Sequence, residues 1–383
     1  MKFLLVFALL GAALGQEWNL IWEDEFDSLD EEKWEHEVTA WGGGNGEFQV
    51  YTPDPENSYV RDGLLFIKPS LLPENINPAT GEPFGEDFLT NGHLDLEELY
   101  GNCTDADPET NCIRHGSEAN IPPTMSARLR TYQRFAFGQG RAELRAKMPR
   151  GDWLWPAMWM LPEDWAYGDW PMSGEIDIVE TMGNEDLKFT DSGEDTGIQK
   201  MGSTTHWGPS FDQNRYYLTL TDRLNYTHDF ANYFHDYVIE WDENSIRWYL
   251  DDEFILSVPD PPVNEQEEFS FYDLGAPWSE GTANPWEGAS PMAPFDQDFH
   301  FLLNVAVGGI GGYIPDDVIN RGDNELYGKP WNNTQTQVTY TCLPRLPNVL
   351  CLLGWDARDR WLWTWEGEDA AMQVDYIRVY ERA

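Results

Sequence analysis

Three carboxylates alternate with apolar residues in the segment Ser173–Glu180, which reads SGEIDIVE. On a regular β-strand, Glu175 and Asp177 point to one face, while the isoleucines between and after them point to the other face and can enter a core. Glu180 has the wrong parity for the carboxylate face. One extra residue, inserted as a β-bulge near Val179, would restore it, and bulges often re-aim side chains next to active sites. The segment therefore predicts a bulged strand with three acids on one face.

This spacing suits the hydrolysis of a glycosidic bond. With the bulge, Glu175 and Glu180 are effectively four strand positions apart, or roughly 13 Å between Cα atoms. If the two side chains lean together, their carboxyl groups come within about 5 to 6 Å, the separation of a retaining glycosidase. One carboxylate would attack the anomeric carbon while the other protonates the leaving oxygen. Asp177 lies between them, where its charge would raise a neighbour's pKa.

In so acidic a chain, the same acids could also line the solvent face of an ordinary strand. A tryptophan-rich stretch just before the segment favours the catalytic interpretation. Its members are Trp153, Trp155, Trp159, Trp165 and Trp170. Indole rings stack on the C–H faces of sugars, and they desolvate a nearby acid and so raise its pKa. The segment 152–180 is therefore the predicted active site.

Composition excludes one class of partner. The 383 residues include 68 Asp and Glu against 24 Lys and Arg, a net charge of −44 at pH 7. Nucleic-acid binding needs a basic surface, so no nucleic acid is expected as a partner. The chain also holds 19 Trp, 17 Tyr and 19 Phe. This is more aromatic surface than a core requires, and it favours a sugar-binding groove.

The first residues predict secretion. Lys2 precedes an apolar run that ends at Leu14 and is too short to span a membrane. We interpret residues 1–15 as a signal peptide and residues 16–383 as one secreted, extracellular domain, without a membrane anchor. Three glycosylation sequons agree with this compartment, at Asn102, Asn225 and Asn332.

The four cysteines form two close pairs along the chain, Cys103 with Cys112 and Cys342 with Cys351. Three connectivities are possible, and we expect the two local disulfides. Their spacing does not suit zinc, so a structural role is expected, with no metal and no cofactor.

Short segments with period-two alternation dominate the chain, which indicates an all-β sandwich or barrel. The clearest strand is 141–148. Hairpins are expected at Asp62-Gly63 and at Asp251-Asp252, and a closing strand at 373–380. The stretches near 71–123 and 332–354 are expected to be surface insertions, and no linker divides the chain.

The chain resembles the β-1,3-glucanases, or laminarinases, of glycoside hydrolase family 16, in the animal branch that includes β-1,3-glucan recognition proteins. The resemblance covers nearly all of the mature chain. It is carried by ordered landmarks along the sequence: WEDEF at 22–26, GGGNGE at 42–47, MSARLR at 125–130, GDWLWPAMW at 151–159, SGEIDIVE at 173–180, GSTTHWG at 202–208, NVAVGG at 304–309, KPW at 329–331 and VDYIRVY at 374–380.

The resemblance implies a β-jelly-roll sandwich of two curved antiparallel sheets with a concave substrate cleft. It implies that Glu175 is the nucleophile, Glu180 the general acid/base and Asp177 their electrostatic partner. It also implies sugar contacts, or a place near the acid/base, for a further set of residues: Asn45, Arg128, Trp155, Trp159, Trp170 and His206. The implied activity is endo-hydrolysis of a β-1,3-glucan such as laminarin by a monomeric enzyme.

Two other functions fit parts of the pattern. A secreted recognition protein that binds β-1,3-glucan without cleaving it belongs to the same branch, but such relatives have lost one or both glutamates. Both glutamates and the aspartate are present here. A jelly-roll lectin is the third possibility, and it would need no acid pair in a Trp-lined groove.

Overall fold

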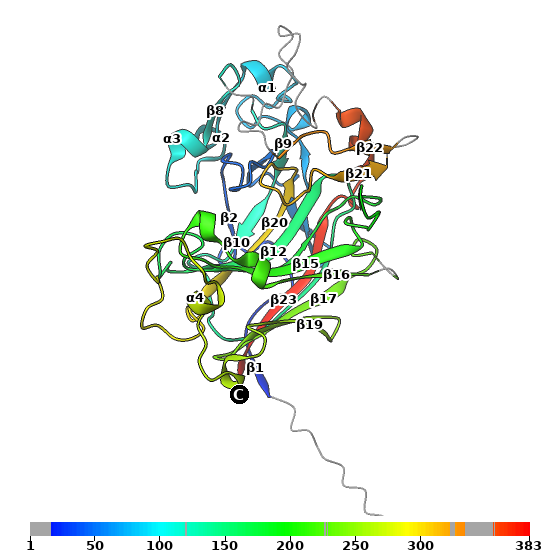
Figure 1. Cartoon of the computed structure of the whole chain (residues 1–383). Helices are drawn as coiled ribbons and strands as arrows, with labels where there is room; N and C mark the ends of the chain where they lie inside the picture. Colours follow the sequence, from blue (N-terminus) through cyan, green and yellow to red (C-terminus); the bar gives the residue numbers. More distant parts are fainter. Residues whose placement is uncertain are drawn as a thin grey trace, which may run out of the picture.

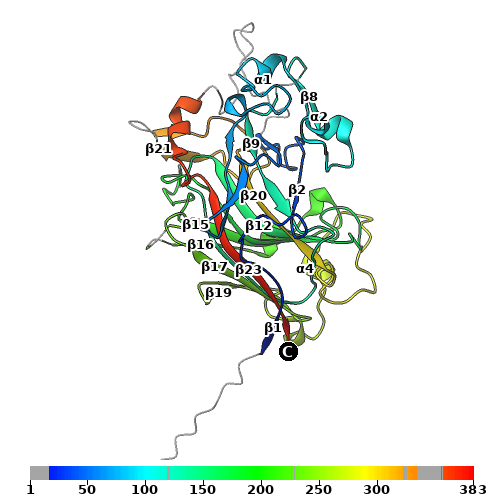
Figure 2. The ribbon, with the colours of Figure 1, turned by 180° about the vertical axis from the view of Figure 1, so that it is seen from behind.

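The computed structural model describes residues 17–118, 121–225, 227, 229–321, 326–333, 355 and 357–383. Two large antiparallel sheets face each other in a jelly-roll sandwich, as Figures 1 and 2 show from opposite sides. This confirms the expected fold. The proposed signal peptide and the second cysteine pair, Cys342 and Cys351, lie outside the described residues.

The first sheet has eight strands and carries none of the predicted site residues. Its order is β19 (Glu253–Val258), β18 (Ile246–Leu250), β17 (His235–Trp241), β11 (Gly140–Lys147), β23 (Met372–Arg382), β5 (Leu64–Ile67) and β4 (Ser58–Arg61), and β1 (Trp18–Asp24) also pairs with β23.

The second sheet has seven strands and carries most of the predicted site. Its order is β16 (Leu220–Leu224), β15 (Lys200–His206), β13 (Glu175–Thr181), β12 (Leu154–Pro162), β20 (Phe299–Val307), β10 (Arg128–Arg130) and β2 (Glu35–His36).

Smaller elements decorate this sandwich. Three small sheets comprise β14 (Lys188–Phe189), β21 (Val318–Arg321) and β22 (Leu326–Gly328); β3 (Gln49–Tyr51), β9 (Thr124–Ser126) and β6 (Ser70–Leu71); and β7 (His93–Asp95) with β8 (Ile113–His115). The α-helices are α1 (Phe88–Asn91), α2 (Leu96–Tyr100), α3 (Pro108–Asn111) and α4 (Phe271–Leu274). Single 3-10 turns are η1 (Leu72–Glu74), η2 (Phe211–Gln213), η3 (Tyr216–Leu218), η4 (Val263–Glu265), η5 (Arg358–Arg360) and η6 (Leu362–Thr364).

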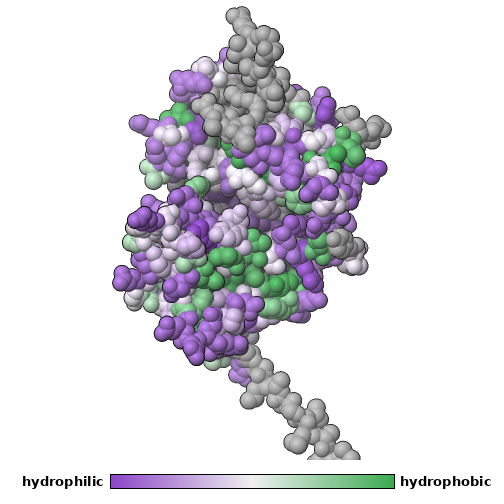
Figure 3. Space-filling view, viewed as in Figure 1, coloured by the Kyte–Doolittle hydropathy of each residue, from purple (hydrophilic) through white to green (hydrophobic). Residues whose placement is uncertain are grey.

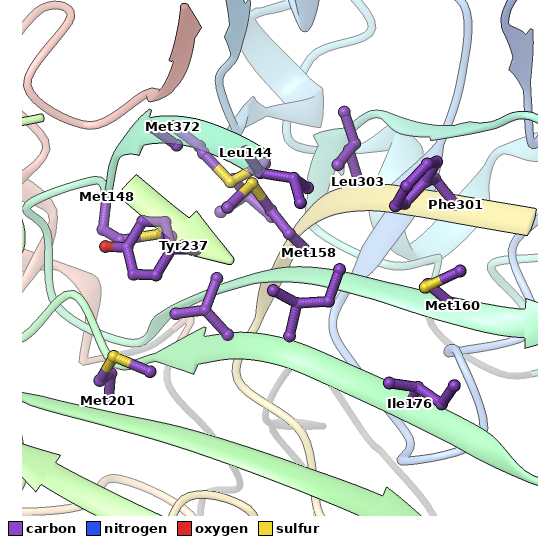
Figure 4. Close-up of a cluster of buried hydrophobic side chains, with 14 of the residues drawn as sticks. Leu144, Met148, Met158, Met160, Ile176, Met201, Tyr237, Phe301, Leu303 and Met372 are labelled. Carbon is purple, nitrogen blue, oxygen red and sulfur yellow. The ribbon is translucent and has the colours of Figure 1, made fainter. Parts of the chain in front are cut away.

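The main core lies between the two large sheets (Figure 4). Met158 on β12 and Ile176 on β13 contribute from the seven-stranded sheet, and Leu144 on β11 and Met372 on β23 contribute from the other sheet. All four side chains are at most 1% exposed. Burial of this kind stabilises a fold by about 1.5 to 3 kcal/mol per large side chain, so the inner face holds each strand's register firmly.

The strands and hairpins expected from alternation are confirmed. Strand β11 alternates between buried and partly exposed residues along its whole length. The turn at Asp62-Gly63 joins β4 to β5, and the turn at Asp251-Asp252 joins β18 to β19. All four turn residues have φ between 50° and 75°. A two-residue turn with two successive positive φ values matches the right-handed twist of the strands that it joins.

The stretch 71–123 gathers at one end of the molecule in both views (Figures 1 and 2). It contains α1 to α3 and the β7–β8 pair. Some of its apolar residues, among them Leu89, Leu94 and Leu96, belong to a second, smaller hydrophobic cluster. A disulfide joins Cys103 to Cys112 across the segment, which confirms the first expected pair. This second cluster is shared with residues outside the stretch, such as Val38, Val50 and Met125.

Candidate active site

Strand β13 carries the bulge that the sequence predicts. On one side, Asp177 pairs with Trp159 of β12 while Val179 pairs with Met158, so Ile178 has no partner of its own. On the other side, the register also shifts between Asp177 and Glu180. Ile178 and Val179 are both buried in the core. Two consecutive inward residues return Glu180 to the face that carries Glu175 and Asp177.

Each glutamate accepts a hydrogen bond from one tryptophan. Trp170 Nε1 donates to Glu175 Oε2 over 2.9 Å, and Trp155 Nε1 donates to Glu180 Oε1 over 2.9 Å. The Trp155 ring is itself stacked on Tyr313, with centroids 4.0 Å apart and planes 3° apart. An indole is a donor only, so each contact orients the carboxylate and leaves its other oxygen for chemistry.

His206 stands beside the acids because β15 pairs with β13 and places it opposite Glu175. Its Nε2 lies 3.3 Å from Asp177 Oδ2 and 3.7 Å from Glu175 Oε1. Asn214 Nδ2 lies 2.7 Å from the other ring nitrogen, Nδ1. The imidazole is thus held between an amide and the carboxylates.

All three acids have pKa values raised to about 8. Burial is the largest cause in each case, because it penalises the charged form. The charge of Asp177 raises the pKa of both glutamates further, and the charge of Glu47 also raises the pKa of Glu180. A hydrogen bond with Glu175 opposes the rise at Asp177. The three acids cannot all ionise at neutral pH, so the set retains a proton there.

The predicted sugar contacts on β12 and β10 lie on the same sheet face. Trp159 stands opposite Asp177 in the register, and its Nε1 donates to Asn304 Oδ1 over 2.7 Å. Arg128 stands opposite Asn304 in turn. Its guanidinium lies 5.3 Å from the centroid of the Trp159 ring. Trp159, Asn304 and Arg128 therefore lie next to one another on three neighbouring strands, beside the row of acids on β13.

Arg128 is only 5% exposed and is held by protein groups. Its terminal nitrogens lie 3.3 Å from Glu37 and 3.8 Å from Glu47. It also donates to the Tyr51 hydroxyl. These contacts give Arg128 a structural role, and its contact with a sugar stays a prediction.

Asn45 lies on the glycine-rich loop that wraps around Glu47. Its side chain donates to Glu47 Oε1 over 3.4 Å. Gly43 has φ +60°, and a Cβ there would lie 2.2 Å from the Glu47 carboxylate, so any other residue would be strained and would displace that carboxylate. The direct sugar contact of Asn45 is likewise untested.

Sequence reasoning missed several members of this site. Tyr313 stacks on Trp155, Asn304 accepts the indole N–H of Trp159, and Asn214 lies beside His206. Tyr313 and Asn304 come from segments more than 120 residues after β13, and Asn214 lies in an irregular loop. The run NVAVGG at 304–309 indicated the strand that carries Asn304, but nothing in the run indicated that the Asn304 side chain belongs to the site.

Ligand atoms of Glu175, Asp177 and His206 lie within 4.8 Å of one another, a separation that a metal ion could also bridge. One of these acids, Glu175, already accepts the indole N–H of Trp170. No other such group occurs among the residues that the structure describes.

The asparagines of the three predicted sequons lie at accessible positions. Asn102 and Asn332 are exposed, and Asn225 is partly exposed. Within the described ranges, no helix has the length and apolar character needed to cross a membrane.

A jelly-roll sandwich with paired glutamates on one sheet face defines a class, the β-sandwich glycoside hydrolases. Comparison with known proteins agrees: the family described as "Glycosyl hydrolases family 16" matches residues 99–288. The chain belongs to glycoside hydrolase family 16.

Three similar proteins illustrate the range of this family. A β-1,3-glucan-binding protein of Penaeus monodon is 45% identical over 94% of this chain and 90% of its own length. A β-glucanase of Rhodothermus marinus is 32% identical over 77% of each chain. The X-ray structure of the laminarinase from Rhodothermus marinus superposes with a TM-score of 0.53 and 25% identity, over 96% of this chain and 99% of that one.

Proposed function

We propose that this protein is a secreted, retaining endo-β-1,3-glucanase that hydrolyses laminarin-type glucans by double displacement. One observation carries the proposal: Glu175 and Glu180 share one face of the bulged strand, and each is oriented by its own indole N–H. A protein that only binds sugar needs no pair of desolvated, separately oriented acids.

The two glutamates have similar surroundings, because each accepts one indole N–H and the pKa of each is raised to about 8. Either can therefore hold the proton that acid catalysis needs. The resemblance to the family assigns Glu175 as the nucleophile and Glu180 as the proton donor.

In the first step, a Glu175 oxygen attacks the anomeric carbon while the bond from that carbon to the bridging oxygen breaks. Glu180 transfers its proton to the departing oxygen. In the second step, Glu180 removes a proton from water, the water oxygen attacks the same carbon, and Glu175 leaves as a carboxylate. Two inversions give net retention.

Secretion is part of the proposal. The leader-like residues 1–15 and the accessible sequons support it. The Cys103–Cys112 disulfide supports it too, because such bonds persist mainly in oxidising compartments. The expected partner is a β-1,3-glucan chain bound by a monomer.

A second candidate function is glucan recognition without cleavage. It is favoured by the name of the Penaeus monodon relative, a β-1,3-glucan-binding protein. The two functions share a ligand and differ in turnover, so turnover discriminates them.

The discriminating experiment incubates the purified protein with laminarin and follows reducing ends and product lengths, beside the Glu175→Gln variant. We expect short oligosaccharides from the unaltered protein alone, and binding to insoluble β-1,3-glucan by both proteins. Binding by both without any cleavage would instead establish the recognition function.

A further inference from the structure

The loop after β15 contains Asn214, which makes three hydrogen bonds, one of them with His206. Asn214 Oδ1 accepts from the backbone N–H of Trp207 over 3.3 Å and from that of Tyr216 over 3.1 Å. These two donors fix the orientation of the amide, because its nitrogen could not replace the oxygen there. Asn214 Nδ2 is then the group that faces His206 Nδ1, 2.7 Å away.

An amide nitrogen is only a donor, so His206 Nδ1 must act as an acceptor. The ring proton consequently resides on Nε2, the nitrogen directed at Asp177 and Glu175. Asp177 Oδ2 is buried and has no hydrogen-bond partner among the described residues, and His206 Nε2 lies 3.3 Å from it.

Other contacts restrict the ring. Tyr216 stacks on the imidazole with centroids 5.2 Å apart, and Trp170 lies against it at 5.6 Å. The charged or titratable groups that face His206 are therefore Glu175, Asp177 and, through its influence on the pKa, Glu180 from β13, with Tyr216 from the loop.

We propose that Asn214 is a positioning residue that fixes the Nε2–H tautomer of His206, so that the imidazole presents a donor to the nucleophile and its aspartate partner. The role in catalysis rests on the proposed glucanase function. The tautomer itself does not, because it follows from the hydrogen bonds alone. Loss of Asn214 is expected to lower the rate more than the substrate affinity. In the other tautomer of His206, Nε2 would present a lone pair to the acids instead of an N–H.

Asn214→Asp tests the proposal with minimal disturbance. The aspartate keeps an oxygen for the Trp207 and Tyr216 N–H groups, and it replaces the donor toward Nδ1 by an acceptor. We expect kcat for laminarin to fall by at least about tenfold, with KM changed less than about threefold. We also expect a changed pH profile, because a carboxylate at this position stabilises a proton on Nδ1.

A double-mutant cycle with His206→Gln separates positioning from loop structure. If Asn214 acts through His206, then Asn214→Asp has no further effect in the His206→Gln background. An equal loss of kcat in both backgrounds would overturn the proposal and leave Asn214 with a purely structural role.

Nitrogen-15 NMR of the unaltered protein tests the tautomer without any variant and without any activity. We expect one unprotonated ring nitrogen in His206, assigned to Nδ1, and a protonated Nε2 at neutral pH. A proton on Nδ1 would overturn the proposal even if the protein hydrolyses laminarin. The expected tautomer in a protein that cleaves no glucan would overturn the proposed function alone.

Discussion

At the level of single residues, each glutamate is oriented by an indole N–H of its own. Trp155 Nε1 is the donor to Glu180, and this contact holds the pKa of Glu180 below the value that burial alone would give. The ring of Trp155 has a separate task, because it stacks on Tyr313. Orientation and packing therefore depend on different parts of one side chain.

Trp155→Phe removes the indole N–H and keeps an aromatic ring. Loss of the donor raises the pKa of Glu180 above about 8. Glu180 must be protonated to act as the acid, so the alkaline limb of kcat/KM moves to higher pH, by about half a unit to one unit. The pH–rate profile on laminarin measures this shift. Trp159→Phe is the matched control, because Trp159 donates to Asn304 and to no carboxylate. An unchanged limb in Trp155→Phe would contradict the assignment of Glu180 as the acid.

At the level of elements, the bulge in β13 and the loop after β15 shape the site. The bulge could be predicted because a parity conflict at Glu180 is visible in the sequence. The support from Tyr313 and Asn214 could not, since it depends on which loops fold over the sheet face. Alternation reports the two faces of a strand, whereas a loop contact leaves no periodic signal.

The loop also carries exposed aromatic side chains close to the acids. Phe211 is 74% exposed, and its ring lies 5.4 Å from that of Trp170. Hydrophobic surface gathers on this face of the molecule, in the region where Figure 1 shows β15 and β16 (Figure 3).

Phe211→Ala is expected to raise KM for long laminarin oligosaccharides by about three- to tenfold, and to change KM for short ones much less. The physical reason is the loss of one stacking platform, worth about 1 kcal/mol. Kinetics on a length series of oligosaccharides measure the effect. Phe254→Ala is the control, because Phe254 is 57% exposed on β19 of the other sheet. An equal rise in KM for oligosaccharides of every length would show that Phe211 does not stack on a sugar unit remote from the acids.

The stretch 71–123, which the sequence predicts to be an insertion, is a second element whose stability can be tested. The Cys103–Cys112 disulfide closes a loop with a sequence separation of 9. Replacing both cysteines by serine should destabilise the insertion by about 2 to 3 kcal/mol, since the unfolded segment regains loop entropy. Hydrogen exchange of α2 and α3 should accelerate while exchange in β12 and β13 stays unchanged. Faster exchange in both regions would mean that the insertion and the sandwich unfold together.

At the level of the whole molecule, the acid set lowers stability as the pH rises. Glu180 has a folded-state pKa of about 8 against an ordinary value of 4.5. A raised acid pKa contributes stability that is present below pH 4.5 and is lost as the pH rises through 8.

Glu180→Gln therefore stabilises the protein by about 1 to 3 kcal/mol at pH 8.5 and leaves its stability unchanged at pH 4. The expected rise in Tm is roughly 2 to 5 °C at the higher pH. Thermal unfolding at the two pH values measures it, with Glu287→Gln as a surface control. A variant that is less stable at pH 8.5 would show that the folded protein favours the ionised glutamate.

The alternation of the chain predicted the sandwich, the hairpins and the position of the acids on one face. The aromatic content indicated a sugar groove but not which rings orient acids and which pack in the core. Trp155 and Trp170 hold carboxylates, whereas Trp153 is 2% exposed in the core. That division depends on strand register, which composition does not encode.

The central claim is that Glu175 forms a covalent bond with the sugar. The most direct test reacts the unaltered protein with a slow, activated 2-fluoro laminaribiosyl donor and locates the attached sugar by peptide mass spectrometry. The account predicts one attached disaccharide per chain, on Glu175, because fluorine at C2 slows the second step and lets the glycosyl-enzyme accumulate. Attachment at Glu180, or rapid hydrolysis of laminarin by a protein that never becomes labelled, would contradict it.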